Sequence, residues 1–222
     1  MSPHGIGLYA GAALVVGGGL RTLALTAPGG PDGGPREALT ALARRRPWVT
    51  LALFAVLAVM AVVQYAAPGV VDGLGRRPGA LTDGQWWRAG TALLVQSSGA
   101  AQIAVNLPAL LVVGAVAEPV LGRWRTLAVF LASGVLAQAV SLAGWSVRGG
   151  GDSVAICGLL GALAVALLAA GPLAEARWAL LVPAGGVLLC ALHNNHGAGL
   201  LAGCLLGLAL LPRTGPAPLT AR

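Results

Sequence analysis

The sequence predicts an all-α membrane protein: a bundle of six transmembrane helices, with a seventh helix left open at the N-terminus. Of its 222 residues, 57% are hydrophobic and only 9% are charged, whereas soluble domains carry about a quarter charged residues. The mean hydropathy is +0.82. The apolar residues also gather in long runs, separated by segments rich in glycine, proline and arginine. A run of about 20 apolar residues is what a helix needs to span the hydrocarbon core.

An N-terminal segment, residues 1–47, precedes the six core helices. Its apolar part, Gly5 to Ala27, is long enough to cross a membrane only if the guanidinium of Arg21 reaches the interface along its aliphatic stem. The segment does not resemble a secretory signal peptide, because no basic n-region precedes the apolar residues. The sequence therefore leaves open an additional membrane helix or a segment that does not cross. A cytoplasmic linker follows and ends in three arginines.

The first core helix is predicted from Trp48 to Ala67, which contains no charged residue and follows the triple arginine. Tryptophan and arginine at the start of an apolar run are typical of a membrane–water interface. The long connection 68–100 holds the run Gly84-Gln85-Trp86-Trp87-Arg88. Because connections of this length are usually functional, we expect this one to lie partly embedded at the interface.

The remaining core helices follow at short intervals. They are predicted over 101–116, 127–145, 153–170, 178–192 and 196–211. The helix over 153–170 would span about 27 Å, just enough for the hydrocarbon core. Residues 48–212 therefore form one membrane domain, and residues 213–222 are predicted to be a disordered tail.

The arginines predict the orientation of the bundle, and the chain contains no lysine. If the triple arginine faces the cytoplasm, the inner loops hold Arg44, Arg45, Arg46, Arg123, Arg125, Arg177 and Arg213, and the outer loops hold Arg76, Arg77, Arg88 and Arg148. This excess follows the positive-inside rule. Gln102, Ser153 and His196 then all fall at the outer leaflet.

The composition argues against two other classes of protein. A net charge of +7 does not indicate nucleic-acid binding, because the arginines are scattered through short loops. The three cysteines (Cys157, Cys190 and Cys204) lie in apolar runs, and their spacings match no metal pattern. His193 and His196, three residues apart with no nearby cysteine or carboxylate, are a weak metal signal. We therefore expect no metal and no cofactor.

Two polar groups stand at the starts of apolar runs. The stretch Gly149 to Ala162 delivers Ser153 to the first turn of a hydrophobic helix, and His196 begins another. The simplest interpretation of Asp152 or Ser153 is a helix N-cap. A neutral histidine can, however, take the proton of a serine hydroxyl. Small residues, including Gly199 and Gly203 after His196, would let the two helices approach closely.

Two amides lie on one face of the second core helix, because Gln102 and Asn106 are four residues apart. One interpretation is hydrogen bonding between helices, a common role for buried amides. The other is an oxyanion hole, in which donors point at the negative oxygen that develops during acyl transfer.

The sequences around Ser153 and His196 resemble the motifs of a known family. The run G-D-S-V-A-I-C-G-L-L-G-A, from Gly151 to Ala162, resembles the rhomboid intramembrane protease pattern G-x-S-G-x-x-x-G-L-x-G-A. The run H-G-A-G-L-L-A-G, from His196 to Gly203, resembles H-x-x-G-L-L-x-G. The resemblance implies a six-helix bundle in the plasma membrane of a bacterial cell, with Ser153 as nucleophile, His196 as general base and then acid, and no third acidic member.

Three weaker blocks extend the resemblance. Trp87-Arg88 resembles the W-R pair of the family's first loop, and Asn106 resembles the asparagine of H-x-x-x-N, with Gln102 at the histidine position. The resemblance implies that Asn106, Gln102 and the N–H of Ser153 hold the oxyanion. The last block resembles the turn E-x-x-x-G-x-x-R and comprises Glu118, Gly122 and Arg125. We interpret this block as structural, with Glu118 pairing with Arg125 or capping backbone.

Two departures keep a second hypothesis open. Val154 stands where the family has glycine, and Gln102 stands where it often has histidine. The first hypothesis is a protease that cleaves transmembrane segments of other proteins near the outer face. The second is a rhomboid-like protein that binds such segments without cleaving them. A transporter or channel is a third hypothesis. The sequence gives it little support, because it shows no repeated halves and Arg21 is its one candidate charge within a span. The expected partners are transmembrane protein substrates and the lipid bilayer.

Overall fold

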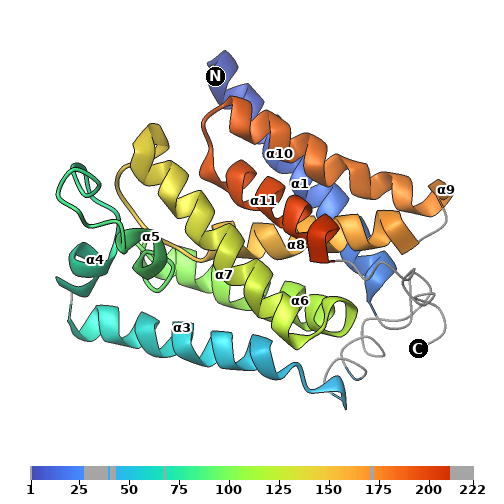
Figure 1. The fold of residues 1–222 in the computed structure, drawn as a ribbon, viewed down its shortest axis with the longest axis horizontal. Helices are drawn as coiled ribbons and strands as arrows, with labels where there is room; N and C mark the ends of the chain where they lie inside the picture. Colours follow the sequence, from blue (N-terminus) through green and yellow to red (C-terminus); the bar gives the residue numbers. More distant parts are fainter. Residues whose placement is uncertain (1, 28–39, 41–43, 68, 171–172, 211–222) are drawn as a thin grey trace.

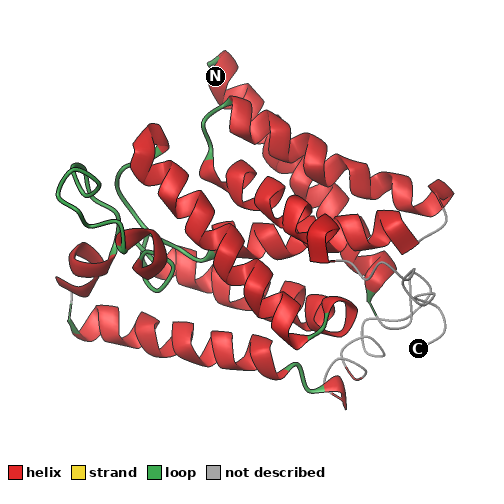
Figure 2. Ribbon diagram, in the orientation of Figure 1, coloured by secondary structure: helices red, strands yellow, loops and turns green. Residues whose placement is uncertain are grey.

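The computed structural model describes residues 2–27, 40, 44–67, 69–170 and 173–210, and the regular elements of this part of the chain are helices (Figures 1 and 2). The helices long and apolar enough to cross a membrane are α1 (Pro3–Thr26), α3 (Trp48–Ala66), α6 (Ala100–Leu121), α7 (Arg123–Val140, continued by a π-helix to Trp145) and α8 (Ser153–Ala170). The shorter helices are α4 (Gly69–Leu74), α5 (Arg88–Thr91), α9 (Leu173–Ala176), α10 (Leu181–Ala191, preceded by a 3-10 turn from Arg177) and α11 (Asn195–Leu210). The predicted all-α membrane fold is confirmed.

The turn between α6 and α7 lies later in the chain than its predicted place. The sequence predicted the end of the helix near Val116, before Glu118 and Pro119, but α6 runs through Pro119 to Leu121. The chain reverses at Gly122, whose φ of 87° lies in the left-handed region that favours glycine. The predicted tail, residues 213–222, lies outside the described residues.

The N-terminal segment contains a continuous helix, α1, which packs against α10 and α8 (Figure 1). Gly7 of α1 lies against Leu192, and Gly18 lies against Leu181, so the two helices run in opposite directions. Arg21 is exposed on this helix. Of the two alternatives for residues 5–27, the structure therefore shows a helix of membrane-spanning length. Most of the predicted linker lies outside the described residues.

The centre of the bundle is α8 (Figure 1). Most of its side chains are buried. It packs against α6, α7 and α11. Its contact with α11 is especially close, because a Cβ at Gly199 would overlap the carbonyl oxygen of Val154 and a Cβ at Gly203 would overlap that of Gly158. The small residues predicted to bring these two helices together lie in their interface.

Glu118 caps the start of α3. Its carboxylate accepts the backbone N–H groups of Val49 (3.2 Å) and Thr50 (2.9 Å) and the Thr50 hydroxyl (3.0 Å). This is one of the two roles that the sequence predicted for it. The other, a pair with Arg125, is not found among the described contacts: Arg125 donates to the Leu121 carbonyl, and Arg123 lies 3.7 Å from Glu118.

We expect Glu118→Ala to lower the free energy of unfolding by about 2–4 kcal/mol, because the buried donors at the start of α3 would lose a charged acceptor. Thermal unfolding in detergent, followed by tryptophan fluorescence, measures the change. Glu118→Gln is the matched control, since it keeps one carbonyl acceptor and should lose less. An unchanged unfolding midpoint for the alanine variant would show that the cap contributes nothing.

Candidate active site

Ser153 and His196 lie within hydrogen-bonding distance of each other. Ser153 is the first residue of α8 and His196 lies in the first turn of α11. The hydroxyl oxygen of Ser153 is 2.9 Å from Nε2 of His196, and both side chains are half-buried. The two residues are 43 positions apart in the chain, so the close packing of α8 on α11 is what brings them together.

Asn194 fixes the proton of the His196 ring. The backbone N–H of His196 donates to Oδ1 of Asn194 over 3.0 Å, so the oxygen of the amide, not its nitrogen, faces the ring. The same Oδ1 lies 2.9 Å from Nδ1 of His196. An oxygen that only accepts requires Nδ1 to carry the hydrogen. In the neutral ring Nε2 then presents its lone pair to the Ser153 hydroxyl.

The loop before Ser153 is held in an extended path. Gly149 exchanges two backbone hydrogen bonds with Arg76, at 2.7 and 3.3 Å. Gly151 donates to the carbonyl of Ala92 over 2.8 Å and accepts from the Gln138 amide over 2.8 Å. Gly151 has a φ of 156°, and a Cβ there would overlap the Gln102 amide nitrogen. The loop therefore needs glycine at this position and presents Ser153 at a fixed place.

Gln102 and Asn106 both donate to acceptors within the protein. The Gln102 amide donates to the Gly150 carbonyl over 3.0 Å, and its oxygen accepts from the Ser98 N–H over 2.8 Å. The Asn106 amide donates to Oε1 of Gln96 (2.8 Å) and to Oδ1 of Asp152 (3.0 Å), which uses both of its hydrogens. Both amides therefore brace the loop that carries Ser153.

A buried polar network adjoins Ser153 through the preceding residue. Its centre is Asp152, which is fully buried and accepts from Gln96 over 2.6 Å as well as from Asn106. Gln96 exchanges two further bonds with Gln64 of α3, at 2.9 and 3.2 Å. Oδ2 of Asp152 has no hydrogen-bond partner among the described residues. Burial therefore raises the pKa of this carboxyl, and the bonds from the two amides oppose the shift.

This shift predicts a pH-dependent stability. Because the pKa of Asp152 in the folded protein is above its ordinary value of 3.8, the protonated carboxyl favours folding. Its contribution is complete below pH 3.8 and is lost as the pH rises through the folded pKa. We expect Asp152→Asn, which keeps the Oδ1 acceptor and removes the charge, to gain thermal stability relative to wild type as the pH rises from about 4 to 7. Equal pH dependence in both proteins would contradict this prediction.

The other residues singled out in the sequence form no hydrogen bond with the side chain of Ser153 or His196 among the described contacts. Arg88 anchors the long loop by donating to the Asp72 and Gly75 carbonyls, and its guanidinium stacks on the Trp87 ring at 4.8 Å. The three cysteines are free. In the part of the chain that the structure describes, no group of three histidine, cysteine or acidic side chains could hold a metal ion.

Asn194, Gln96 and Asp152 are the site residues that sequence reasoning missed or took for simple caps. Asn194 precedes His196 by two residues, and an asparagine at this spacing before a helix is a signal for a side-chain cap. That signal could have identified Asn194. Gln96 and Asp152 are 56 positions apart, and only the fold shows that they meet.

Comparison with protein families gives a match over much of the chain. The model of the family described as Rhomboid domain matches residues 83–213, more than half of the chain, from the loop before α5 to beyond α11. The comparisons with curated proteins and with solved structures found no match.

Proposed function

This chain belongs to the rhomboid family, and on that premise we propose that it is an intramembrane serine endopeptidase that cleaves transmembrane segments of other proteins. The observation that carries the proposal is the distance of 2.9 Å between the Ser153 hydroxyl and Nε2 of His196. Asn194 leaves that nitrogen free to accept a proton. A serine hydroxyl paired with a neutral, oriented imidazole is the arrangement that nucleophilic acyl transfer requires.

The proposed reaction has two halves. Oγ of Ser153 attacks the peptide carbonyl while Nε2 of His196 takes its proton, and Asn194 holds the Nδ1–H of the resulting imidazolium. The imidazolium then gives its proton to the leaving amine, which departs and leaves an acyl ester on Ser153. A water molecule, deprotonated by His196, hydrolyses that ester, and the proton returns to Ser153 as the acid leaves.

Backbone N–H groups are the first proposed hydrogen-bond donors to the oxyanion. The first N–H groups of a helix have no acceptor within it, so those of Ser153 and Val154 at the start of α8 are the nearest donors to the nucleophile. Asn106 and Gln102 remain the proposed side-chain donors. Both amide hydrogens of Asn106 are used by Gln96 and Asp152, so Asn106 must exchange a partner before it can donate to substrate. Gln102 donates one amide hydrogen to the Gly150 carbonyl, and its second N–H has no acceptor among the described contacts.

The substrate would approach within the membrane. We propose that the end of the bundle carrying Ser153 faces outward, because the other end is richer in arginine. In this orientation the protein would lie in the plasma membrane of a bacterial cell and cleave segments whose helix unwinds near the outer surface. The reaction would use protein groups and water, with no cofactor.

The second candidate is a silent binder, by which we mean a rhomboid-like protein that binds transmembrane segments without cleaving them. Two observations favour it. Val154, which replaces the family's glycine, is almost fully buried beside the nucleophile. The Asn106 amide uses both of its hydrogens within the protein, and the Gln102 amide uses one. A protein in which these contacts cannot open would bind transmembrane segments without cleaving them.

Incubating the purified full chain in detergent with a panel of model transmembrane substrates separates the two candidates. Mass spectrometry of the products maps any cut. We expect cleavage within the transmembrane segment, near the end that lies at the outer surface. Binding of the substrates without any cleavage, in wild type and in Val154→Gly alike, would support the silent binder and contradict the proposal.

A further inference from the structure

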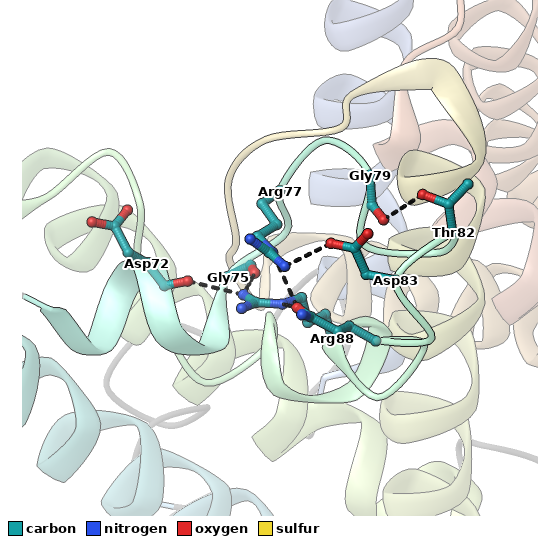
Figure 3. A network of polar contacts seen from close by, with 8 residues as sticks. Asp72, Gly75, Arg77, Gly79, Thr82, Asp83 and Arg88 are labelled. Atoms are coloured by element: carbon teal, nitrogen blue, oxygen red, sulfur yellow. Dashed lines mark hydrogen bonds and ion pairs between the residues drawn. The ribbon is translucent and has the colours of Figure 1, made fainter.

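A cavity lies beside the loop that leads to Ser153. It has a volume of about 690 Å³, within the range of small-molecule sites. Four arginines line it: Arg76, Arg77, Arg88 and Arg148. The acidic residue in its lining is Asp72, whose carbonyl accepts from Arg88 (Figure 3). The cavity is therefore strongly basic.

Most of this positive charge has no acidic partner. Asp83 pairs with Arg77 at 2.7 Å (Figure 3). Arg76, Arg88 and Arg148 form no ion pair within the described residues. A guanidinium removed from water is costly unless an anion compensates it. The cavity is thus built with more positive charge than the protein itself neutralises.

Arg76 is the clearest case of an arginine in this cavity whose charge no acidic residue neutralises. It is 8% exposed and donates only to neutral acceptors, Oε1 of Gln138 at 2.6 Å and the Arg148 carbonyl at 3.0 Å. Its Nε is buried without a partner among the described residues. Burial lowers the pKa of Arg76 to about 10. Burial and the nearby charge of Arg77 also lower the pKa of Arg88, as expected where like charges lie close without an anion between them.

The surroundings of the cavity indicate where an anion would come from. Trp86 and Trp87, next to Arg88, are exposed, as is usual for tryptophan at a membrane surface. The Arg88 guanidinium lies over the Trp87 ring. Trp87 also lines an apolar groove of about 220 Å³ with Leu53, Leu57 and Phe130. A basic cavity and an apolar groove therefore meet at the Trp87–Arg88 pair.

We propose that this cavity binds the phosphate of a phospholipid headgroup, with an acyl chain of the same lipid in the adjoining groove. Guanidinium groups match the geometry of phosphate oxygens and bind them through paired hydrogen bonds. An acidic peptide would satisfy the arginines but would leave the groove without an occupant. The proposal does not depend on proteolysis, because lipid binding is measured in the absence of substrate.

The bound lipid would also touch the loop that carries Ser153. Gly149 and Ser97 line the cavity, and Gly149 is bonded to the backbone of Arg76. Occupancy would therefore hold together the two loop segments that contain Arg76 and Gly149. We expect a bound phospholipid to raise the thermal unfolding midpoint of the protein.

The test is native mass spectrometry of the full-length protein released from detergent, with dioleoylphosphatidylglycerol as the probe. Dioleoylglycerol, which has the same chains and no phosphate, is the matched lipid. Arg77→Gln and Arg148→Gln are the variants, since both side chains are exposed and their loss should spare the fold. Arg177→Gln, at the opposite end of the bundle, is the control for net charge. Unfolding midpoints without lipid confirm that each variant is folded.

We expect one phosphatidylglycerol to bind the wild type, with its dissociation constant raised roughly 5-fold by each cavity variant and roughly 30-fold by the double variant. The control should bind as the wild type does, and dioleoylglycerol should not compete. Equal binding by the double variant, or equal binding of dioleoylglycerol, would overturn the proposal. So would displacement of the lipid by inorganic phosphate or by a glutamate-rich peptide at the same concentration, since either would identify a site for free anions or for protein.

Discussion

Ser153→Ala is expected to reduce cleavage of a transmembrane substrate by about 10⁴-fold or more, because the proposed acyl ester forms on the Ser153 oxygen. His196→Ala should cost about as much, since the hydroxyl would keep its proton. The double variant should be no slower than either single one, because the two residues act as a unit. Initial rates at saturating substrate, measured by gel or by mass spectrometry of the products, test all three expectations.

Ser146→Ala is the matched control for this prediction. Ser146 is an exposed serine in the loop between α7 and α8, outside the Ser–His pair. Its loss should leave the rate unchanged. Cleavage that survives Ser153→Ala would mean that another residue is the nucleophile, and Cys157, at 1 helical turn from Ser153, would be tested next by Cys157→Ala.

Asn194→Ala is expected to lower kcat by between about 10² and 10⁴-fold with little change in KM. Without Oδ1, the His196 ring loses the acceptor that fixes its proton on Nδ1. It can then turn its protonated nitrogen toward Ser153. Because the carbonyl oxygen also caps the first turn of α11 through the His196 N–H, a loss of stability of about 1 kcal/mol should accompany the loss of rate.

Asn194→Asp separates the two effects. A carboxylate accepts from the same ring nitrogen and the same backbone N–H, so most of the activity should return. Its charge would also stabilise the imidazolium form, and the acidic limb of the pH–rate profile should move to higher pH. An unmoved profile together with full activity in Asn194→Ala would show that Asn194 only caps the helix.

Much of the fold could be predicted from the sequence, because a membrane allows so few solutions. A run of apolar residues must be a helix in lipid, and the spacing of Gly199 and Gly203 indicates which helices meet. The end of α6 was harder to predict. Glu118 is a poor residue for a lipid-facing helix, but it is buried against the start of α3, and only that partner explains why the helix continues.

Part of the candidate site could likewise be predicted from the sequence, and part could not. Ser153 and His196 stand out because a hydroxyl and an imidazole each begin an apolar run whose small residues predict close helix packing, and the packing of α8 on α11 brings them together. The present partners of Asn106 could not be read from the sequence, because Asp152 and Gln96 come from distant parts of the chain. The four arginines of the basic cavity are also distributed over two loops. Each of them alone is an ordinary interfacial residue.

Covalent labelling of the purified protein with a fluorophosphonate, followed by peptide mass spectrometry, is the most direct test of the proposed Ser153–His196 chemistry. Such a probe needs no knowledge of the substrate, since the serine oxygen displaces fluoride while the histidine takes the proton. We expect one phosphonylated residue, Ser153, with labelling abolished by His196→Ala and slowed by Asn194→Ala. No adduct on the folded wild-type protein, or an adduct on another residue that persists in His196→Ala, would contradict this expectation.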